Sequence, residues 1–149
     1  MRGKHVMEIS NELQQFLHQM QRAIDHFVAG DPGPYQVCWS TTDDVTIMGA
    51  WGAYEQGWEL VGPRLEWAAA RFRGGHIDFE PLALAMSGDL AYTIWIERGQ
   101  VRVGECDELS PMVLRVTHLF RREEGNWKLI HRHADAMSEK IEATAILQR

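Results

Sequence analysis

Eight apolar side chains near the start of the chain fall at steps of three and four residues, the spacing of one face of an α-helix. They are Ile9, Leu13, Phe16, Leu17, Met20, Ile24, Phe27 and Val28. Ser10 and Asn11 are suitable capping residues, and the segment 30–34, rich in Gly and Pro, ends the helix. We therefore predict an amphipathic helix over residues 8–29, whose apolar face must be covered by a second layer of structure.

The rest of the chain changes from helical to strand patterning. Residues 45–48 form a β-branched segment typical of a strand, and residues 58–72 return to a helical pattern. Pro63 within that pattern predicts a kink or a division into two segments. Further strands are predicted over residues 76–86, 90–97, 101–103, 112–122 and 127–133. Helices followed by an antiparallel sheet indicate an α+β architecture, with one sheet face packed on the helices.

The composition limits the class of protein. A chain of 149 residues has the length of one domain, and its net charge of −6 argues against binding nucleic acid. Its apolar stretches fall far short of the roughly 20 residues that span a bilayer, and no signal peptide is recognisable. Cys38 and Cys106 lie far apart without CxxC spacing, which predicts free thiols. We expect one cytoplasmic domain over residues 1–149 that binds neither nucleic acid nor a membrane.

The C-terminal hairpin carries the most informative polar residues. A three-residue loop over 123–125, with Gly125 in the left-handed position, would pair Arg122 with Asn126. This register predicts one sheet face whose polar residues form the end of a cavity between sheet and helices: Arg115, Thr117, His131 and His133. The opposite face then carries Val116, His118, Phe120, Ile130 and Arg132.

Several interpretations of this polar group stay open. His131 and His133 could bind one metal ion, which needs a third ligand. The register sends His118 to the opposite face and Arg115 would oppose a cation, so we predict no metal site. A four-residue loop would instead bring His118 beside His131. Arg115 could hold an acidic ligand or pair internally with Asp135, and the group could also be a set of satisfied polar residues.

Two aromatic residues stand in the glycine-flanked segment 49–57, between a predicted strand and a predicted helix. Large aromatic residues are more often core than ligand wall, but loop aromatics flanked by glycines are poor choices for packing. We therefore predict that Trp51 and Tyr54 line the mouth of the cavity.

Three stretches resemble a known superfamily, namely residues 43–52, 57–63 and 114–135. They are similar to the SnoaL-like, nuclear transport factor 2-like superfamily, which includes ketosteroid isomerase homologues and the association domain of calcium/calmodulin-dependent protein kinase II. The resemblance implies a cystatin-like cone of α+β class, in which a curved antiparallel sheet wraps around the N-terminal helices and encloses a pocket. It also implies that Gly49 stands where ketosteroid isomerases have their general-base aspartate.

We accordingly expect a SnoaL-like small-molecule-binding protein of unassigned reaction, with a ligand that is polar or anionic at one end. The predicted ligand-binding residues are Trp51, Tyr54, Arg115, Thr117, His131 and His133. If the protein is an enzyme, proton transfer, isomerisation or hydrolysis would use His131, His133 or Asp135. A noncatalytic association or ligand-binding module is the alternative, and no cofactor is expected.

The resemblance also implies dimerisation through the outer face of the sheet. Three apolar residues on the face opposite the predicted cavity would otherwise form an exposed patch, and such patches usually mark interfaces. We predict a homodimer that buries Val116, Phe120 and Ile130.

Overall fold

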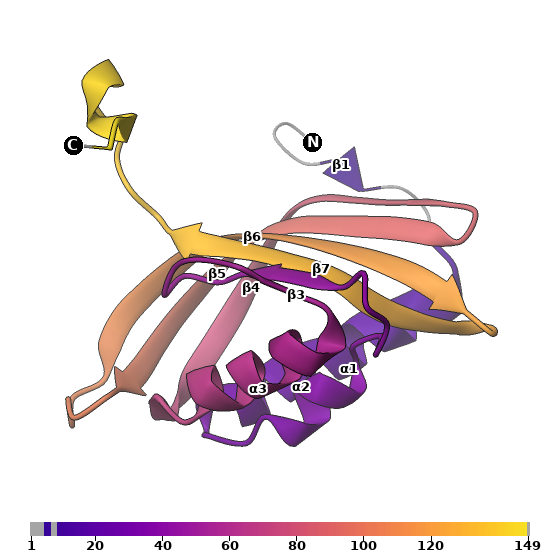
Figure 1. Ribbon diagram of the computed structural model, residues 1–149, viewed down its shortest axis with the longest axis horizontal. Coiled ribbons are helices and arrows are strands. Elements are labelled where there is room, and N and C mark those ends of the chain that lie inside the picture. The colour runs from indigo at the N-terminus through magenta and orange to yellow at the C-terminus, as the bar shows by residue number, and fades with distance from the viewer. Residues whose placement is uncertain (1–4, 7–8, 149) are drawn as a thin grey trace.

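The computed structural model describes residues 5–6 and 9–148, which form a layer of helices against one face of a curved sheet (Figure 1). The helices are α1 (Asn11–Val28), α2 (Gly33–Val37) and α3 (Trp58–Ala69). A short 3₁₀ helix over Ala143–Ile146 follows the last strand and stands away from the body of the molecule. The predicted α+β class, with the sheet wrapped around the helices, is confirmed.

Within the described residues the sheet has seven strands in the order β1-β4-β5-β6-β7-β2-β3. The long strands are β4 (Phe72–Ser87), β5 (Leu90–Val103), β6 (Ser110–Glu123) and β7 (Asn126–Ala136). The short strands are β1 (His5–Val6), β2 (Thr46–Met48) and β3 (Glu55–Gln56). Consecutive long strands are antiparallel as predicted, whereas β1 pairs with β4 and β2 with β7 in parallel. The sheet is therefore mixed.

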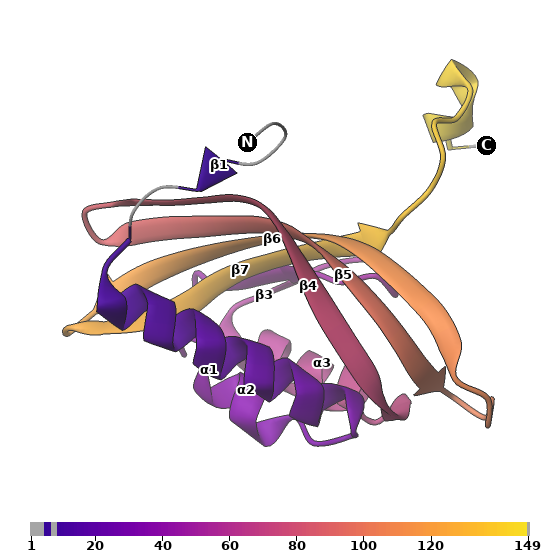
Figure 2. The ribbon, with the colours of Figure 1, turned by 180° about the vertical axis from the view of Figure 1, so that it is seen from behind.

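The predicted apolar face of α1 packs under the sheet, along which the helix runs in the rear view (Figure 2). Ser10 caps the helix, because its Oγ accepts a hydrogen bond of 3.2 Å from the backbone N–H of Leu13. The buried residues of α1 are Leu13, Phe16, Leu17, Met20, Ala23, Ile24 and Val28. The predicted first helical residue, Glu8, lies outside the described residues. No helix in the described part of the chain is long and apolar enough to cross a membrane.

Two elements that the sequence predicts as divided are continuous. Helix α3 runs through Pro63 as one element, and β5 runs through the predicted turn at residues 98–100. Gly99 fits closely at this point, because a Cβ at this position would collide with the side chain of Ile77 on β4. The glycine thus lets β4 and β5 approach closely, and both strands stay paired on either side of it.

The β6–β7 hairpin differs from the prediction in its turn. Glu124 and Gly125 both have positive φ, 52° and 84°, which is typical of a two-residue type I′ turn, and Glu123 pairs with Asn126. Farther along, Phe120 lies opposite Leu129 but Leu119 lies opposite His131. Ile130 is thus an extra residue on β7, that is, a β-bulge.

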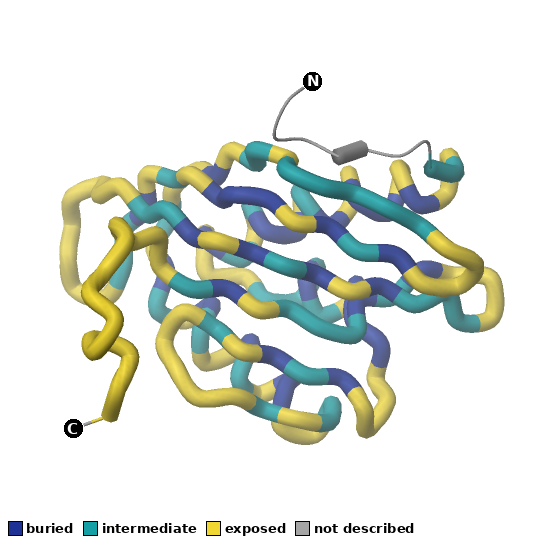
Figure 3. The backbone as a smooth tube through the Cα atoms, turned by 90° about the horizontal axis from the view of Figure 1, so that it is seen from above, coloured by how far each residue is buried: buried dark blue, intermediate teal, exposed yellow. Residues whose placement is uncertain are grey.

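The bulge at Ile130 reverses the two faces of β7. Leu129 points into the core before it and Ala134 after it, although strict alternation would place residues 129 and 134 on opposite faces. The inner face of the hairpin therefore carries Val116, His118, Phe120, Arg132 and Ala134, and the outer face carries Arg115, Thr117, Leu119, His131 and His133. Figure 3 shows the resulting alternation of buried and exposed segments along the long strands.

The observed direction of the β6 side chains corrects the predicted interface residues. Val116 is 2% exposed and Phe120 is fully buried in the core of the single chain, so the prediction that they form a dimer interface is wrong. Ile130 is partly buried and packs against the same core. The side chains available on the outer face are instead those assigned from the sequence to the cavity.

Candidate functional site

A cavity of about 310 Å³ lies between the inner face of the sheet and the helices α1 and α3. This volume is at the lower end of the range of ~300–1,000 Å³ that small-molecule sites occupy. Its wall is mostly apolar and is completed by the backbone at Gly49 and Ala50. The apolar wall residues are Ile24, Phe27, Val28, Ile47, Trp51, Leu65, Ala68, Phe72, Ile77, Val103, Met112, Leu114, Ala134 and Ala136.

Three polar side chains line the cavity, and we call them the polar floor: Tyr35, Glu97 and Arg132. Arg132 on β7 holds Glu97 on β5 in a bidentate ion pair, with Nη1–Oε2 at 2.9 Å and Nη2–Oε1 at 3.0 Å. Trp95 Nε1 also donates to Glu97 Oε2 at 2.9 Å. The Arg132 and Glu97 side chains are only 13% and 2% exposed, so the floor holds a buried pair without net charge.

His118 on β6 lies behind this pair and is fully buried. Its Nε2 is 3.1 Å from Nη1 of Arg132, and because a guanidinium only donates, Nε2 must accept. The ring proton therefore sits on Nδ1, which faces Thr93 Oγ1 at 3.4 Å. Burial, together with the charge of Arg132, lowers the pKa of His118 well below its usual range. The imidazole is thus neutral.

Tyr35 on α2 offers the hydrogen-bond donor of the floor. Burial raises the pKa of its phenol above the usual range, so the hydroxyl keeps its proton. It lies 3.3 Å from Nε2 of His118, the same atom that accepts from Arg132. Because Arg132 already satisfies that nitrogen, the Tyr35 hydroxyl can turn to a carbonyl or hydroxyl oxygen in the cavity without leaving His118 unpaired.

The Arg132 side chain keeps its positive charge in the polar floor. Burial disfavours the charged form of Arg132, but its contacts with the Glu97 carboxylate and with Tyr35 together outweigh this effect and raise the Arg132 pKa above its usual value. Glu97 is the one carboxylate among the described residues that line the cavity, and Arg132 and Trp95 occupy its oxygens. Gly49, where the resemblance expects a general base, lines the cavity without a side chain.

The residues predicted to form the polar end of the cavity lie on the other side of the sheet. Arg115 donates to both oxygens of Asp135 at 2.8 Å, which confirms the internal pairing that was one open interpretation and lowers the pKa of Asp135. His131 Nδ1 lies 2.7 Å from Thr46 Oγ1. None of Arg115, Thr117, His131 and His133 lines the cavity, so the predicted face is wrong. On β6 the even-numbered residues face the core, and on β7 the bulge at Ile130 turns His131 and His133 outward.

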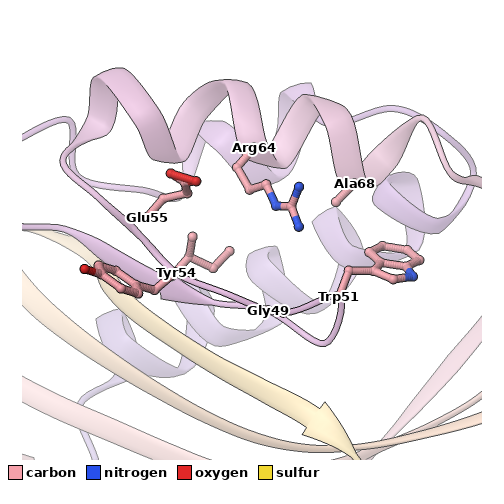
Figure 4. Close-up of a pocket in the computed structure, with 8 residues that line it drawn as sticks. Gly49, Trp51, Tyr54, Glu55, Arg64 and Ala68 are labelled. Carbon is pink, nitrogen blue, oxygen red and sulfur yellow. The ribbon is translucent and has the colours of Figure 1, made fainter.

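The two predicted aromatic residues take different places. Trp51 lines the cavity and is 44% exposed, in agreement with a position at its mouth. Tyr54 is 67% exposed and does not line the cavity, but it lines a smaller adjoining pocket between α3 and the segment 47–55 (Figure 4). In the described part of the chain, no group of three or more His, Cys, Asp or Glu side chains is placed to hold a metal ion.

Sequence reasoning missed the polar floor. The sequence analysis places Glu97 at the end of a predicted strand and Arg132 on the face opposite the predicted cavity. One signal was available: Thr93, Trp95 and Glu97 alternate along β5, and a carboxylate on the same face as a buried tryptophan needs a cation nearby. His118 was recognised only as a potential metal ligand.

We expect the free energy of unfolding to fall as the pH is lowered from 6.5. The folded-state pKa of His118 lies well below the unfolded value, so its contribution is complete above about pH 6.5 and is lost as the pH decreases. Below pH 6.5 the unfolded chain binds one proton more than the folded chain, so the free energy of unfolding decreases by roughly 1.4 kcal/mol per pH unit. The loss is then about 2 kcal/mol at pH 5. His131, whose pKa burial also lowers, acts in the same direction.

Urea denaturation at several pH values between 5 and 7.5 measures this loss. The variant His118→Gln lacks the titrating group, so its stability should change less steeply over the same range, whatever its stability at pH 7.5. An equal slope in both proteins would show that His118 is not the buried neutral base described above.

Comparison with known proteins agrees with this geometry. The family described as SnoaL-like domain matches residues 17–138. Among solved structures, a nuclear transport factor 2-like superfamily protein from Salmonella enterica is similar at a TM-score of 0.75 and 13% identity, covering 89% of this chain and 93% of that one. A second similar structure is a protein from Thiobacillus denitrificans that is provisionally named a calcium/calmodulin-dependent protein kinase type II association domain. Its TM-score is 0.71 at 16% identity, and the match covers 89% of this chain and 100% of that chain.

A third similar structure is a ketosteroid isomerase-like protein from Erwinia carotovora, with a TM-score of 0.69, 16% identity and coverage of 86% of this chain and 95% of that chain. No curated protein matches the chain. At these identities the structural likenesses show a common fold, and they assign no activity.

Proposed function

Because this chain belongs to the SnoaL-like family, we propose that it is a small-molecule-binding protein whose ligand has a mostly apolar body. The observation that carries the proposal is the cavity of about 310 Å³, with apolar walls and a buried polar floor. Such a combination, in which a few polar groups orient a ligand inside an apolar site, is typical of small-molecule sites. The Tyr35 hydroxyl would donate a hydrogen bond to a carbonyl or hydroxyl group at the inner end of the ligand.

The polar floor favours a noncatalytic binding module over proton abstraction. A general base has to be free to accept a proton near neutral pH. Here the Glu97 carboxylate is held by Arg132, and Nε2 of His118 accepts from the same guanidinium. Proton transfer, isomerisation or hydrolysis would need a further group, which the ligand itself or a second chain would have to supply.

The binding of a neutral apolar probe tests this proposal. We expect N-phenylnaphthylamine to bind with a dissociation constant on the order of micromolar. Ala68→Phe should weaken binding at least ~10-fold, because Ala68 lines the cavity and also its smaller neighbour, so the added ring would fill the space they share. Fluorescence titration gives both constants.

A matched control is Ala29→Phe, which adds the same ring at an exposed position after α1 and should leave the affinity unchanged. If the wild-type chain does not bind the probe, or if Ala68→Phe binds it as tightly as the wild type, the cavity is not a binding site.

We further propose that two chains associate through the outer face of the sheet. Support comes from three exposed apolar side chains on this face, Met48, Ile94 and Leu119, which are 37% to 41% exposed. The register pairs Ile94 with Thr117, which in turn pairs with His133, so the apolar groups stand among polar ones as at many interfaces. We also propose a reducing compartment such as the cytoplasm, because Cys38 and Cys106 are free.

Light scattering at micromolar concentration should give a mass of about twice the 17.1 kDa of one chain. The variant Leu119→Glu should give the mass of a single folded chain, because association would bury the added carboxylate at the interface without a partner. A wild-type mass near 17.1 kDa would contradict the proposed dimer.

A further inference from the structure

Two arginines are stacked on one tryptophan beside the mouth of the cavity. The Cζ atoms of Arg64 and Arg71 lie 4.0 Å and 4.2 Å from the ring centroid of Trp67. Trp51, which lines the cavity, packs edge-on against the same indole with centroids 5.6 Å apart. We call Arg64, Trp67 and Arg71 the mouth cluster.

Within the part of the chain that the structure describes, the arginines of the mouth cluster have no carboxylate partner. Six other arginines pair with carboxylates, namely Arg73, Arg98, Arg115, Arg121, Arg122 and Arg132. Within the described residues, neither Arg64 nor Arg71 has a carboxylate oxygen within 4.0 Å or a side-chain hydrogen bond. Stacking orients a guanidinium through its flat face and leaves its in-plane N–H groups available. Both arginines are therefore positioned for an oxyanion but unoccupied by one from the chain.

The mouth cluster is continuous with the cavity. Arg64 lines the smaller pocket, and that pocket shares Ile47, Gly49, Trp51 and Ala68 with the cavity. In Figure 4 the Arg64 side chain descends from α3 and its guanidinium extends toward the Gly49–Trp51 side, away from the carboxylate of Glu55. Arg71 directly precedes Phe72, another residue of the cavity wall.

The two ends of the site thus differ in charge. At the inner end, Arg132 is neutralised by Glu97 and His118 is neutral, so an anion would meet a carboxylate there without a free cation. At the mouth, two arginines carry charge that no described carboxylate balances within 4.0 Å. An anionic group is consequently favoured at the mouth and disfavoured at the floor.

Building on the proposed binding role, we propose that the ligand is an amphipathic anion. Its carboxylate or other oxyanion is held at the mouth by Arg64 and Arg71, and its apolar body enters the cavity with an uncharged end toward Tyr35. Arginine suits this role because its fork of N–H donors matches the geometry of an oxyanion.

A pair of probes with the same ring system separates this inference from the binding role. Anilinonaphthalene sulfonate is N-phenylnaphthylamine with an added sulfonate. We expect the double variant Arg64→Met, Arg71→Met to lower the affinity for the anionic probe about 10-fold. Its affinity for the neutral probe should stay within about 2-fold of the wild-type value. Arg98→Met, which removes an arginine paired with Glu80, should change neither affinity. Ala68→Phe should abolish both, which places both probes in the cavity.

Each other outcome has a definite meaning. An unchanged affinity for the anionic probe in the double variant overturns the proposed anion site, while binding of the neutral probe still supports the binding role. An equal loss of both probes also overturns it, because the arginines would then act on the cavity and not on the charge. If neither probe binds the wild-type chain, the binding role itself fails.

Discussion

Replacing Phe120 with glutamate is expected to unfold the chain. Phe120 is fully buried and packs edge-on against Phe16 of α1, with centroids 5.5 Å apart. Loss of a buried phenylalanine costs about 3–5 kcal/mol, and burial of a carboxylate without a partner adds several more. The sum approaches the whole stability of a small domain, about 5–15 kcal/mol. Near-ultraviolet circular dichroism should show the loss of ordered aromatic packing.

The neighbouring residue supplies the control. Leu119 lies on the outer face and is 41% exposed, so Leu119→Glu should keep the native spectrum. The two variants differ by one position in the chain and place the same charge on opposite faces of β6. A folded Phe120→Glu beside an unfolded Leu119→Glu would show that the faces of the hairpin are assigned the wrong way round.

Replacing Arg132 with methionine should lower the free energy of unfolding by about 3–5 kcal/mol, the usual cost of removing one partner of a buried ion pair. The Glu97 carboxylate, 2% exposed, would be left without its cation, and Nε2 of His118 would lose a donor. Methionine retains much of the apolar stem of the arginine, so packing contributes little to the change. Urea denaturation at pH 7 measures it.

The double variant Glu97→Gln, Arg132→Met tests the cause of this loss. Glutamine removes the buried charge and keeps an oxygen that can accept from Trp95 Nε1. The double variant should therefore be more stable than Arg132→Met alone, since a neutral side chain costs less to bury than an unpaired carboxylate. A double variant that is less stable than the single one would exclude the buried charge as the cause.

The sequence was sufficient to predict the layers of the fold. The apolar face of α1 follows from spacing along the helix itself, and its buried residues are largely the predicted ones. The order of helices and strands then predicted the α+β class. These features depend on local periodicity, and local periodicity is visible in the order of the residues.

The faces of the last hairpin could not be predicted in the same way. They depend on the type of turn at Glu124–Gly125 and on the bulge at Ile130, and a shift of one residue moves every following side chain to the other face. Strict alternation therefore placed His131 in the cavity and Arg132 outside it. The residue types were informative, but the face to which the β7 side chains point depended on one irregularity in the backbone.

The polar floor and the mouth cluster lay beyond the sequence for different reasons. Tyr35 and His118 are 83 positions apart, and only the folded sheet brings them together. By contrast, Arg64 and Trp67 follow helical spacing on α3 and could have been recognised as stacked neighbours, whereas Arg71 lies beyond the end of this helix. Among the described residues Arg64 and Arg71 lack a carboxylate partner, and this lack, on which the proposed anion site depends, is visible only in three dimensions.

A crystal structure of the complex with N-phenylnaphthylamine tests the central claim most directly. The account predicts electron density for the probe between α3 and the inner face of the sheet, with its inner end near the Tyr35 hydroxyl. Density on the outer face, beside His131 and His133, with an empty cavity behind it, would contradict the claim.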